Sequence, residues 1–471
     1  MDTPTLKHNS VGFWRVVFQG ISASAPAAIV ATITAASAYA NGSLPLSFLI
    51  AFFGVLLSIV AIYEYSKKIS SAGGYYAFVS RSSGPFAGIV TGMLVFGYQL
   101  TGLAFVPLYF TIIVYYAFAF FAGITIPAYL WVLVAIVTMI LWSIPPYLGI
   151  KPSLNYSLIL STAEMVVLGI ISFVIILVSG NSNSLTVYTP IFSPTGFNGV
   201  LLGGVFGITA FLGYGSVVTL GEEAKEPKRT IKKALLADVL IVGAFFVLFS
   251  YAFTIGWGHL YGLGALHNMS SFTSSLVPAS VEGYRLIGLV PALLITFFGA
   301  ESTFNAGLSF TTSVTRYLYA FSRDGHVLPK SLSKVHAKSG VPRRALIVSF
   351  ISFVTISIVA GLTLGVFYGF VILAAAETIF ALVIHIIVNS TVWRLYKGKE
   401  RSILIHFIIP AVSSATFLYI IFASVYPVSY PIVIAPVAAA VWTVISVFLV
   451  IRARKLRREE YNKAGLYSSV E

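Results

Sequence analysis

The sequence predicts an all-α membrane protein that crosses the bilayer twelve times. Of its 471 residues, 58% are hydrophobic and only 9% are charged, whereas a soluble domain carries about 25% charged residues. Long apolar segments recur along the whole chain, and the connections between them are alternately rich in lysine and arginine and free of them. Together these observations predict a single integral-membrane domain over residues 1–471.

Each predicted span is an apolar segment of at least about 18 residues, the length that a helix needs to cross the hydrocarbon core. The third and eighth segments are longer, which predicts a tilted helix or one that extends beyond the bilayer. The predicted spans are residues 13–38, 46–66, 86–120, 126–144, 153–179, 199–221, 235–256, 284–321, 343–361, 364–390, 403–424 and 430–452.

The positions of the 29 lysines and arginines predict the orientation of the chain. Because positive residues stay on the cytoplasmic side, we expect both termini inside the cell and a multi-pass protein in the cytoplasmic membrane. The net charge of +14 then reflects topology, and we expect no nucleic-acid partner. Only Arg285 lies on the opposite side. The connections without lysine or arginine are 39–45, 121–125, 180–198, 257–283, 362–363 and 425–429.

Enzymatic signatures are missing from the sequence. The absence of cysteine excludes disulfides, thiol catalysis and thiolate metal sites. The chain contains no H-E-x-x-H, G-x-S-x-G or P-loop motif. We therefore predict that the protein is not an enzyme, and that it needs no cofactor and no catalytic or structural metal.

The sixth predicted span is unusually rich in glycine and ends in a charged run. Glycines stand at 203, 204, 207, 213, 215 and 221, and residues 222–229 read EEAKEPKR. Each glycine weakens a helix interior by about 1 kcal/mol relative to alanine. In lipid a broken helix is tolerated only where the freed backbone faces protein or a water-filled cavity. We therefore expect a break at 211–215 that binds a ligand; the alternative is a glycine-rich helix that packs closely against its neighbours.

The first predicted span carries a matching irregularity. Residues 20–26 read GISASAP, and Pro26 lacks the N–H that a helix interior requires. Interrupted spans five apart predict two inverted repeats, residues 13–179 and 199–390, with the substrate at the midplane. Helices over 403–452 and a basic cytoplasmic tail over 453–471 complete the chain. At such a site the N–H groups at the start of a half-helix favour a carboxylate, and the carbonyl groups at the end of a half-helix favour an ammonium group. The alternative for span one is a kink that serves only packing.

Three stretches now resemble the amino acid–polyamine–organocation transporter superfamily. The loop after span two reads SAGGYYAFVSR over 71–81, followed by Gly84-Pro85. Span six contains AFLGY over 210–214 and ends in EEAKEPKR. The end of span eight reads RYLYAFSRDG over 316–325, followed by Leu328-Pro329 and Val341-Pro342. The chain is therefore similar to amino acid permeases over nearly its whole length.

This resemblance implies a leucine-transporter-like fold of five plus five helices with two more at the C-terminus. It also implies that the backbone at 22–26 binds an amino acid's carboxylate and that the backbone at 210–215 binds its amine, with Phe211 as an aromatic lid. The expected substrate-binding residues are Ile21, Ser22, Ala23, Ser24, Ala25, Ala210, Phe211, Leu212, Gly213, Tyr214 and Gly215. The family's common Gly-Ser-Gly in span one is Ser-Ala-Ser here, and a frequent glutamate is Gly215. These departures favour a neutral amino acid over a polyamine.

Three acidic residues lie deep within predicted spans, where an ionisable group costs at least about 2.5 kcal/mol. Glu164 is expected to take up and release a proton, because relatives hold a sodium ion or a titratable group at this place. Glu301 and Glu377 are further coupling candidates, or partners of a cationic substrate. All three have a structural alternative, a permanent hydrogen bond to a neighbouring helix. A sodium site would use Ser309, Thr311 and Thr312, although such hydroxyls commonly bond to their own helix.

Charged residues at the predicted cytoplasmic ends of spans six and eight suggest an inner gate. The candidates are Glu222, Glu223, Arg323 and Asp324; a solvated surface cluster is the alternative. The sequence thus predicts a secondary transporter of amino acids or related amines that works by alternating access, with proton symport favoured. Exchange or sodium coupling remain as alternatives, and a non-transporting sensor or a channel is less favoured. The sequence does not indicate an oligomeric state.

Overall fold

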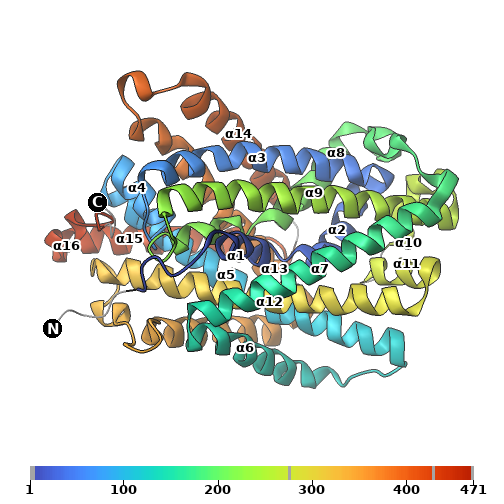
Figure 1. Ribbon diagram of the computed structural model, residues 1–471, viewed down its shortest axis with the longest axis horizontal. Coiled ribbons are helices and arrows are strands. Elements are labelled where there is room, and N and C mark those ends of the chain that lie inside the picture. Colours follow the sequence, from blue (N-terminus) through green and yellow to red (C-terminus); the bar gives the residue numbers. More distant parts are fainter. Residues whose placement is uncertain (1–5, 274–276, 427–429, 468–471) are drawn as a thin grey trace.

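The computed structural model describes residues 6–273, 277–426 and 430–467, and within them the protein is helical, with no β-strand. Parts of the predicted connections 257–283 and 425–429, and the end of the predicted tail, lie outside these residues. The long helices run side by side as one bundle (Figure 1). They are α1 (Phe13–Ser24), α2 (Ile29–Ala40), α3 (Leu44–Lys68), α5 (Pro85–Ala117), α6 (Trp131–Leu148), α7 (Ile150–Ser179), α8 (Phe197–Phe211), α9 (Pro227–Tyr261), α12 (Leu289–Arg323), α13 (Arg343–Leu395), α14 (Ile409–Val425) and α15 (Ile434–Leu456).

Ten helical runs of the described chain are long and apolar enough to cross a membrane, which confirms a polytopic helical membrane protein. The two longest have 56 and 53 residues. A straight 53-residue helix would extend about 80 Å, more than twice the hydrocarbon thickness of a bilayer. Each of these two runs therefore contains more than one span.

The 53-residue run, α13, reverses direction at Gly365. This glycine has φ 78° and ψ 158°, which no helical residue adopts. A Cβ at Gly369 would come within 3.2 Å of the Ala360 carbonyl oxygen, although nine residues of straight helix would separate them by about 13 Å. The reversal lies next to the connection predicted at 362–363.

The 56-residue run contains α1, α2 and α3, and it turns between α2 and α3. Asn41 there has φ 47° and ψ −132°, and its side-chain amide donates to the His267 carbonyl at 2.7 Å. After the turn, Ser47 of α3 donates to the Val200 carbonyl of α8 at 2.8 Å. These two reversals fit the predicted spans, but the total of twelve stays a prediction.

The predicted eighth span, 284–321, needs a correction at its start. Residues 278–287 form a separate short helix, α11 (Pro278–Ile287), and the spanning helix α12 begins only at Leu289. Gly288 separates them with φ 97° and ψ −171°. The sequence placed the boundary too early because the apolar residues of α11 run directly into those of α12. The other short helices are α4 (Tyr75–Ser83), α10 (Met269–Phe272) and α16 (Arg458–Asn462).

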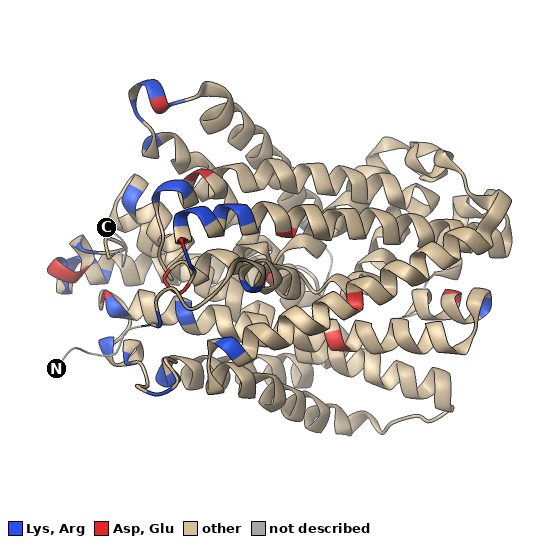
Figure 2. Cartoon of the chain, viewed as in Figure 1, with Lys and Arg blue, Asp and Glu red and all other residues tan. Residues whose placement is uncertain are grey.

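Basic residues are concentrated at one end of the bundle, the end that also holds both termini (Figure 2). The opposite end is nearly free of them. This distribution is what the alternating connections of the sequence predicted, because spans that cross in turn bring every second connection to the same end.

Single cysteines test the reversal at Gly365 in a chain that has no natural cysteine. Thr363 and Lys399 are both exposed; Thr363 lies just before the reversal at Gly365, and Lys399 follows the end of α13 at Leu395. In intact cells we expect Thr363→Cys to react with a membrane-impermeant maleimide, because the reversal brings it to the outer surface. The control, Lys399→Cys, should react only after permeabilisation. Reaction of both positions only after permeabilisation would contradict this topology.

Candidate functional site

The first span is broken at the predicted place. Helix α1 ends at Ser24, Ala25 adopts a left-handed conformation with φ 48° and ψ 69°, and Pro26 opens a short 3-10 turn that leads into α2. Proline removes a backbone donor and excludes helical geometry from the residue before it. The Gly20–Pro26 segment of the sequence therefore produces a real interruption.

The sixth span is broken as well. Helix α8 ends at Phe211, Leu212 is extended, and a 3-10 helix over 214–220 replaces the α-helix. Gly213 has φ 152°, and a Cβ there would overlap the backbone of Ala23 and Ser24. Only glycine fits this position, because both its backbone conformation and its surroundings exclude a side chain.

The two breaks contact each other directly. Ser24 Oγ donates to the Phe211 carbonyl oxygen at 3.1 Å, so the freed end of α8 is satisfied by the broken first span. Ser216 Oγ donates to the Gln19 carbonyl oxygen at 3.1 Å on the other side of the break. Thus the two interruptions, nearly 200 residues apart in sequence, form one local structure.

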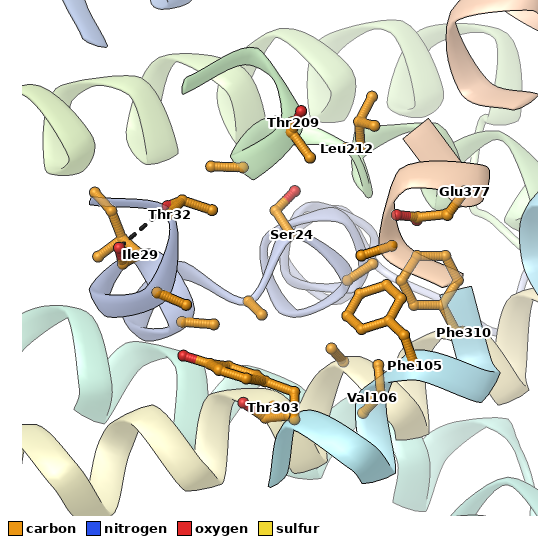
Figure 3. Close-up of a pocket in the computed structure, with 18 of the residues that line it drawn as sticks. Ser24, Ile29, Thr32, Phe105, Val106, Thr209, Leu212, Thr303, Phe310 and Glu377 are labelled. Carbon is orange, nitrogen blue, oxygen red and sulfur yellow. Dashed lines mark hydrogen bonds between the residues drawn. The ribbon is translucent and has the colours of Figure 1, made fainter. Parts of the chain in front are cut away.

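A cavity of about 120 Å³ lies against this structure (Figure 3). Five of the predicted substrate residues line it, namely Ala23, Ser24, Ala25, Ala210 and Leu212. The rest of the wall comes mainly from α2, α5, α12 and the second half of α13, with Thr209 from α8 and Ala28 from the turn before α2, and most of it is apolar. The additional lining residues with rings or polar groups are Thr32, Phe105, Tyr109, Thr209, Thr303, Phe310, Phe370 and Glu377.

The predicted lid residue Phe211 does not line the cavity. Its ring points away from it, stacked on Phe52 at 6.2 Å and edge-on to Phe246 at 4.9 Å. Phe105 and Phe310 form aromatic parts of the wall instead (Figure 3), and Phe370 of a third helix also lines the cavity. The sequence could not identify these residues, because apolar spans give no signal for which face of a helix turns inward.

The remaining predicted substrate residues lie beside the cavity. Ile21 and Ser22 are fully buried below it. Gly213, Tyr214 and Gly215 border a second, much smaller void of about 10 Å³. The Tyr214 hydroxyl is hydrogen-bonded to Ser58 at 2.9 Å and to His385 at 3.1 Å, so this second region is a structural junction.

Glu164 lies on α7 immediately behind the break of the first span. It is fully buried, and neutral donors rather than a cation face its carboxylate. Its neighbours include Glu301 and Ser302 of α12 and the backbone N–H of Ala27. That N–H donates to Ser302 Oγ at 3.2 Å, so Glu164 is one side chain away from the broken segment.

The hydroxyl side chains of α12 that were predicted as a possible sodium site do not all approach the first span. Ser309 Oγ meets Ser22 Oγ of α1 and lies 3.3 Å from Ser157 Oγ of α7. Thr311 instead donates to the Gly307 carbonyl of its own helix at 2.7 Å. Thr312 bonds to Ser153 at 2.7 Å. The structure therefore brings Ser309 to the first span but leaves Thr311 and Thr312 elsewhere.

Two ion pairs connect the charged segment after the sixth span to α12 at the basic end of the bundle. Arg323 holds Glu222 with two hydrogen bonds of 3.0 and 3.1 Å. Glu223 accepts from Arg316 Nε at 2.9 Å, and both side chains are fully buried. Asp324 does not join these pairs, since it accepts from the Tyr76 hydroxyl at 2.5 Å.

The C-terminal segment covers this ion-paired region. The Gly465 N–H donates to Asp324 at 2.8 Å, and the Tyr467 ring lies 3.6 Å from the Arg323 guanidinium. Arg81, after the second span, donates to the carbonyls of both Gly465 and Tyr467. The described part of the predicted basic tail is therefore packed against the gate residues.

Several buried charged residues were not among the predicted site residues, and Asp238 and Arg316 are two of them. Asp238 of α9 is fully buried, and its carboxylate lies against Gly20, where a Cβ would overlap it. The rule that identified Glu164, an acid inside a predicted span, also applies to Asp238. Arg316 was noted as the first residue of the RYLYAFSRDG stretch, but its pairing with Glu223 was not predicted. No three metal-binding side chains gather within the described residues.

Comparison with known proteins gives a consistent picture. The family model for amino acid permeases matches residues 15–454. The chain is 25% identical over 356 residues to the branched-chain amino acid permease BcaP of Bacillus subtilis (strain 168), over 70% of each protein. It is 21% identical over 339 residues to the low-affinity putrescine importer PlaP of Escherichia coli (strain K12), over 70% of this chain and 71% of that protein. The glutamate/serine transporter AimA of B. subtilis is 25% identical over 41% of this chain and 34% of its own length.

Substitution of Gly213 tests the contact between the two breaks. We expect Gly213→Ala to abolish uptake and to lower the melting temperature, because the new methyl group overlaps the backbone of the first span. Gly169 of α7 is the matched control, since nothing lies within 4 Å of a Cβ there. Gly169→Ala should leave uptake and melting temperature unchanged or slightly higher. Equal behaviour of the two variants in detergent melting and uptake assays would refute the close contact.

The buried ion pair predicts a large stability difference between two glutamates. Glu223→Gln leaves the Arg316 charge buried without its partner, which typically costs about 3–5 kcal/mol of unfolding free energy. Glu226 pairs with Arg229 on the surface, where both side chains are more than half exposed. Glu226→Gln should therefore have little effect. Denaturant titration of both variants in detergent measures the difference, and similar losses would argue against a buried pair.

Proposed function

This chain belongs to the amino acid permease family, and we propose that it is a secondary active transporter that moves amino acids or related amines across the cytoplasmic membrane by alternating access. The family is one of permeases rather than enzymes. Relatives are named as carriers of branched-chain amino acids, of glutamate and serine, and of putrescine. Amino acids and putrescine both contain a primary amine, and we expect the substrate of this chain to contain one as well.

The observation that carries the proposal is the meeting of two broken helices at a cavity within the bundle. Backbone groups released by the breaks at Ala25 and Gly213 supply polar contacts where a lipid-exposed chain would have none. The repeats 13–179 and 199–390 each contribute one broken helix. We propose that they are the inverted halves of the transporter, with 403–452 as accessory helices and 453–471 as a cytoplasmic tail.

Alternation requires that the cavity open to one side at a time. In this conformation the basic end is closed by the Glu222–Arg323 and Glu223–Arg316 pairs. With the basic end facing the cytoplasm, this is the state whose inner gate is shut. Opening it requires α8 and its charged connection to separate from α12, which exposes the paired charges to water.

Glu164 is the proposed coupling residue, with Glu301 as its partner. Burying an unpaired carboxylate is expensive, so a proton on Glu164 stabilises the closed arrangement around the first break. When that segment moves and water enters, the charged form is solvated and the proton leaves. Sodium coupling has weaker support, because of the predicted hydroxyls only Ser309 approaches the first span. Exchange of internal for external substrate remains the alternative to symport.

Uptake into proteoliposomes tests this mechanism. With an imposed inward proton gradient and no sodium, we expect the wild type to accumulate labelled amino acid or amine. Glu164→Gln removes the titrating group but keeps its shape, so accumulation should fall to the level of simple equilibration while substrate binding is retained. Glu282→Gln is the matched control, a buried carboxyl on α11 away from the cavity and from both breaks, and it should leave the gradient dependence unchanged.

Two outcomes would contradict the coupling role. If Glu164→Gln accumulates substrate as the wild type does, Glu164 is structural. If the wild type moves substrate only against internal substrate and ignores the gradient, the protein is an exchanger.

A further inference from the structure

The charge within the cavity wall has a single sign. Among the described residues that line the cavity, Glu377 is the only charged one, and no lysine, arginine or histidine accompanies it. The side chain is 3% exposed, and its Oε1 has no hydrogen-bond partner. Its carboxylate points toward the middle of the cavity, in the direction of Ser24 (Figure 3). A buried carboxylate aimed into a cavity needs either a proton or a positive partner, and no described lining residue supplies the positive partner.

The helix ends at the cavity add to this negative potential. Helix α1 ends at Ser24 and α8 ends at Phe211, so two helix C-termini converge on the same cavity. Each C-terminus carries a partial negative charge from carbonyl groups that lack helical partners. Together with Glu377, these ends favour a cation.

The backbone N–H groups at the first break, which could bind a carboxylate, already donate hydrogen bonds within the protein. Pro26 has no N–H, the Ala25 N–H donates to the Ser22 carbonyl at 3.2 Å, and the Ala27 N–H donates to Ser302 Oγ at 3.2 Å. The Ala28 N–H donates to the Ala25 carbonyl at 2.9 Å. The half-helix N-terminus predicted to hold a carboxylate therefore has its hydrogen bonds satisfied internally.

Four of the five hydroxyl groups of the wall already donate to backbone carbonyls, and the fifth, on Tyr109, has no partner among the described residues and can accept a hydrogen bond from an ammonium group. Ser24 donates to the Phe211 carbonyl, Thr209 to the Val205 carbonyl and Thr303 to the Gly299 carbonyl. Thr32 likewise donates to the Ile29 carbonyl. By contrast, the aromatic rings present faces that attract cations as well as apolar carbon. The wall thus suits an ammonium group on a short apolar chain.

We infer that the cavity selects a small organic cation, a primary amine or diamine without a compensating carboxylate, and that Glu377 is its counter-ion. This inference rests on the proposed transport function and narrows its substrate class. It assigns Glu377 to substrate recognition, one of the three roles that the sequence left open for it, in place of proton coupling or a purely structural role. It also reverses the preference for a neutral amino acid that Gly215 suggested, because Glu377 supplies the acid from another helix.

Competition in wild-type proteoliposomes tests the charge preference without any mutation. Uptake of labelled 1,4-diaminobutane and of labelled leucine is measured in parallel. We expect 1,4-diaminobutane to be taken up in preference to leucine. Butylamine should inhibit this uptake, whereas butyrate, of similar size and opposite charge, should not. Preferred uptake of leucine, or equal inhibition by butyrate, would overturn the inference.

Variants of Glu377 then test the counter-ion itself. Glu377→Gln should reduce uptake of 1,4-diaminobutane by at least about thirty-fold, as expected when one partner of a buried charge pair is removed. Glu377→Asp keeps the charge and should retain part of the uptake. Glu282→Gln is the matched control, because Glu282 is also buried but lies on α11 away from the cavity.

The outcomes separate this inference from the transport function. Unchanged diamine uptake by Glu377→Gln overturns the counter-ion role while transport itself stands. A wild type that moves leucine but not the diamine also leaves the transport function intact and refutes the substrate class. If the wild type moves neither the diamine nor any of a set of labelled amino acids, the transport function fails as well.

Discussion

The structure depends on one constraint, the need to satisfy every backbone polar group inside the bilayer without water. Two helices are broken at the same level, and each break is tolerated because the other one lies against it. Ser24 satisfies the carbonyl of Phe211, and the absence of a side chain at Gly213 lets the two backbones touch. A cavity with polar edges in an otherwise apolar bundle follows from this pairing. Either break alone would leave unpaired groups in hydrocarbon.

The closed end of the bundle follows a different physical rule. Buried ion pairs contribute little net stability, but separating their partners without hydration is very unfavourable. The Glu223–Arg316 pair is fully enclosed, whereas Arg323 of the second pair is partly exposed and also contacts Tyr467. Such pairs hold this end of the bundle together and separate only where water can reach the charges. This is the behaviour that the proposed alternating access requires of an inner gate.

Much of this architecture could be predicted from the sequence, because hydropathy and charge alternation report directly on membrane crossing. The breaks were predictable too, since proline and clustered glycine are incompatible with continuous helix at Pro26 and Gly213. The sequence does not indicate which face of each span turns inward. The aromatic wall of Phe105, Phe310 and Phe370 was therefore missed, and Phe211 was expected at the cavity instead. The pairing of Glu223 with Arg316 could not be predicted either, because 93 residues separate them and no local sequence pattern connects them.

The central claim is that one cavity at the two breaks holds the substrate and opens in turn to each side. Its most direct test uses Ala210→Cys, a cavity-lining position in a chain without natural cysteine. An impermeant alkylating reagent is applied to either face of the membrane, with and without transported substrate, in a variant that retains uptake. The account predicts reaction from both faces and protection by substrate. Reaction that substrate leaves unchanged, or that occurs from one face only during active transport, would contradict it.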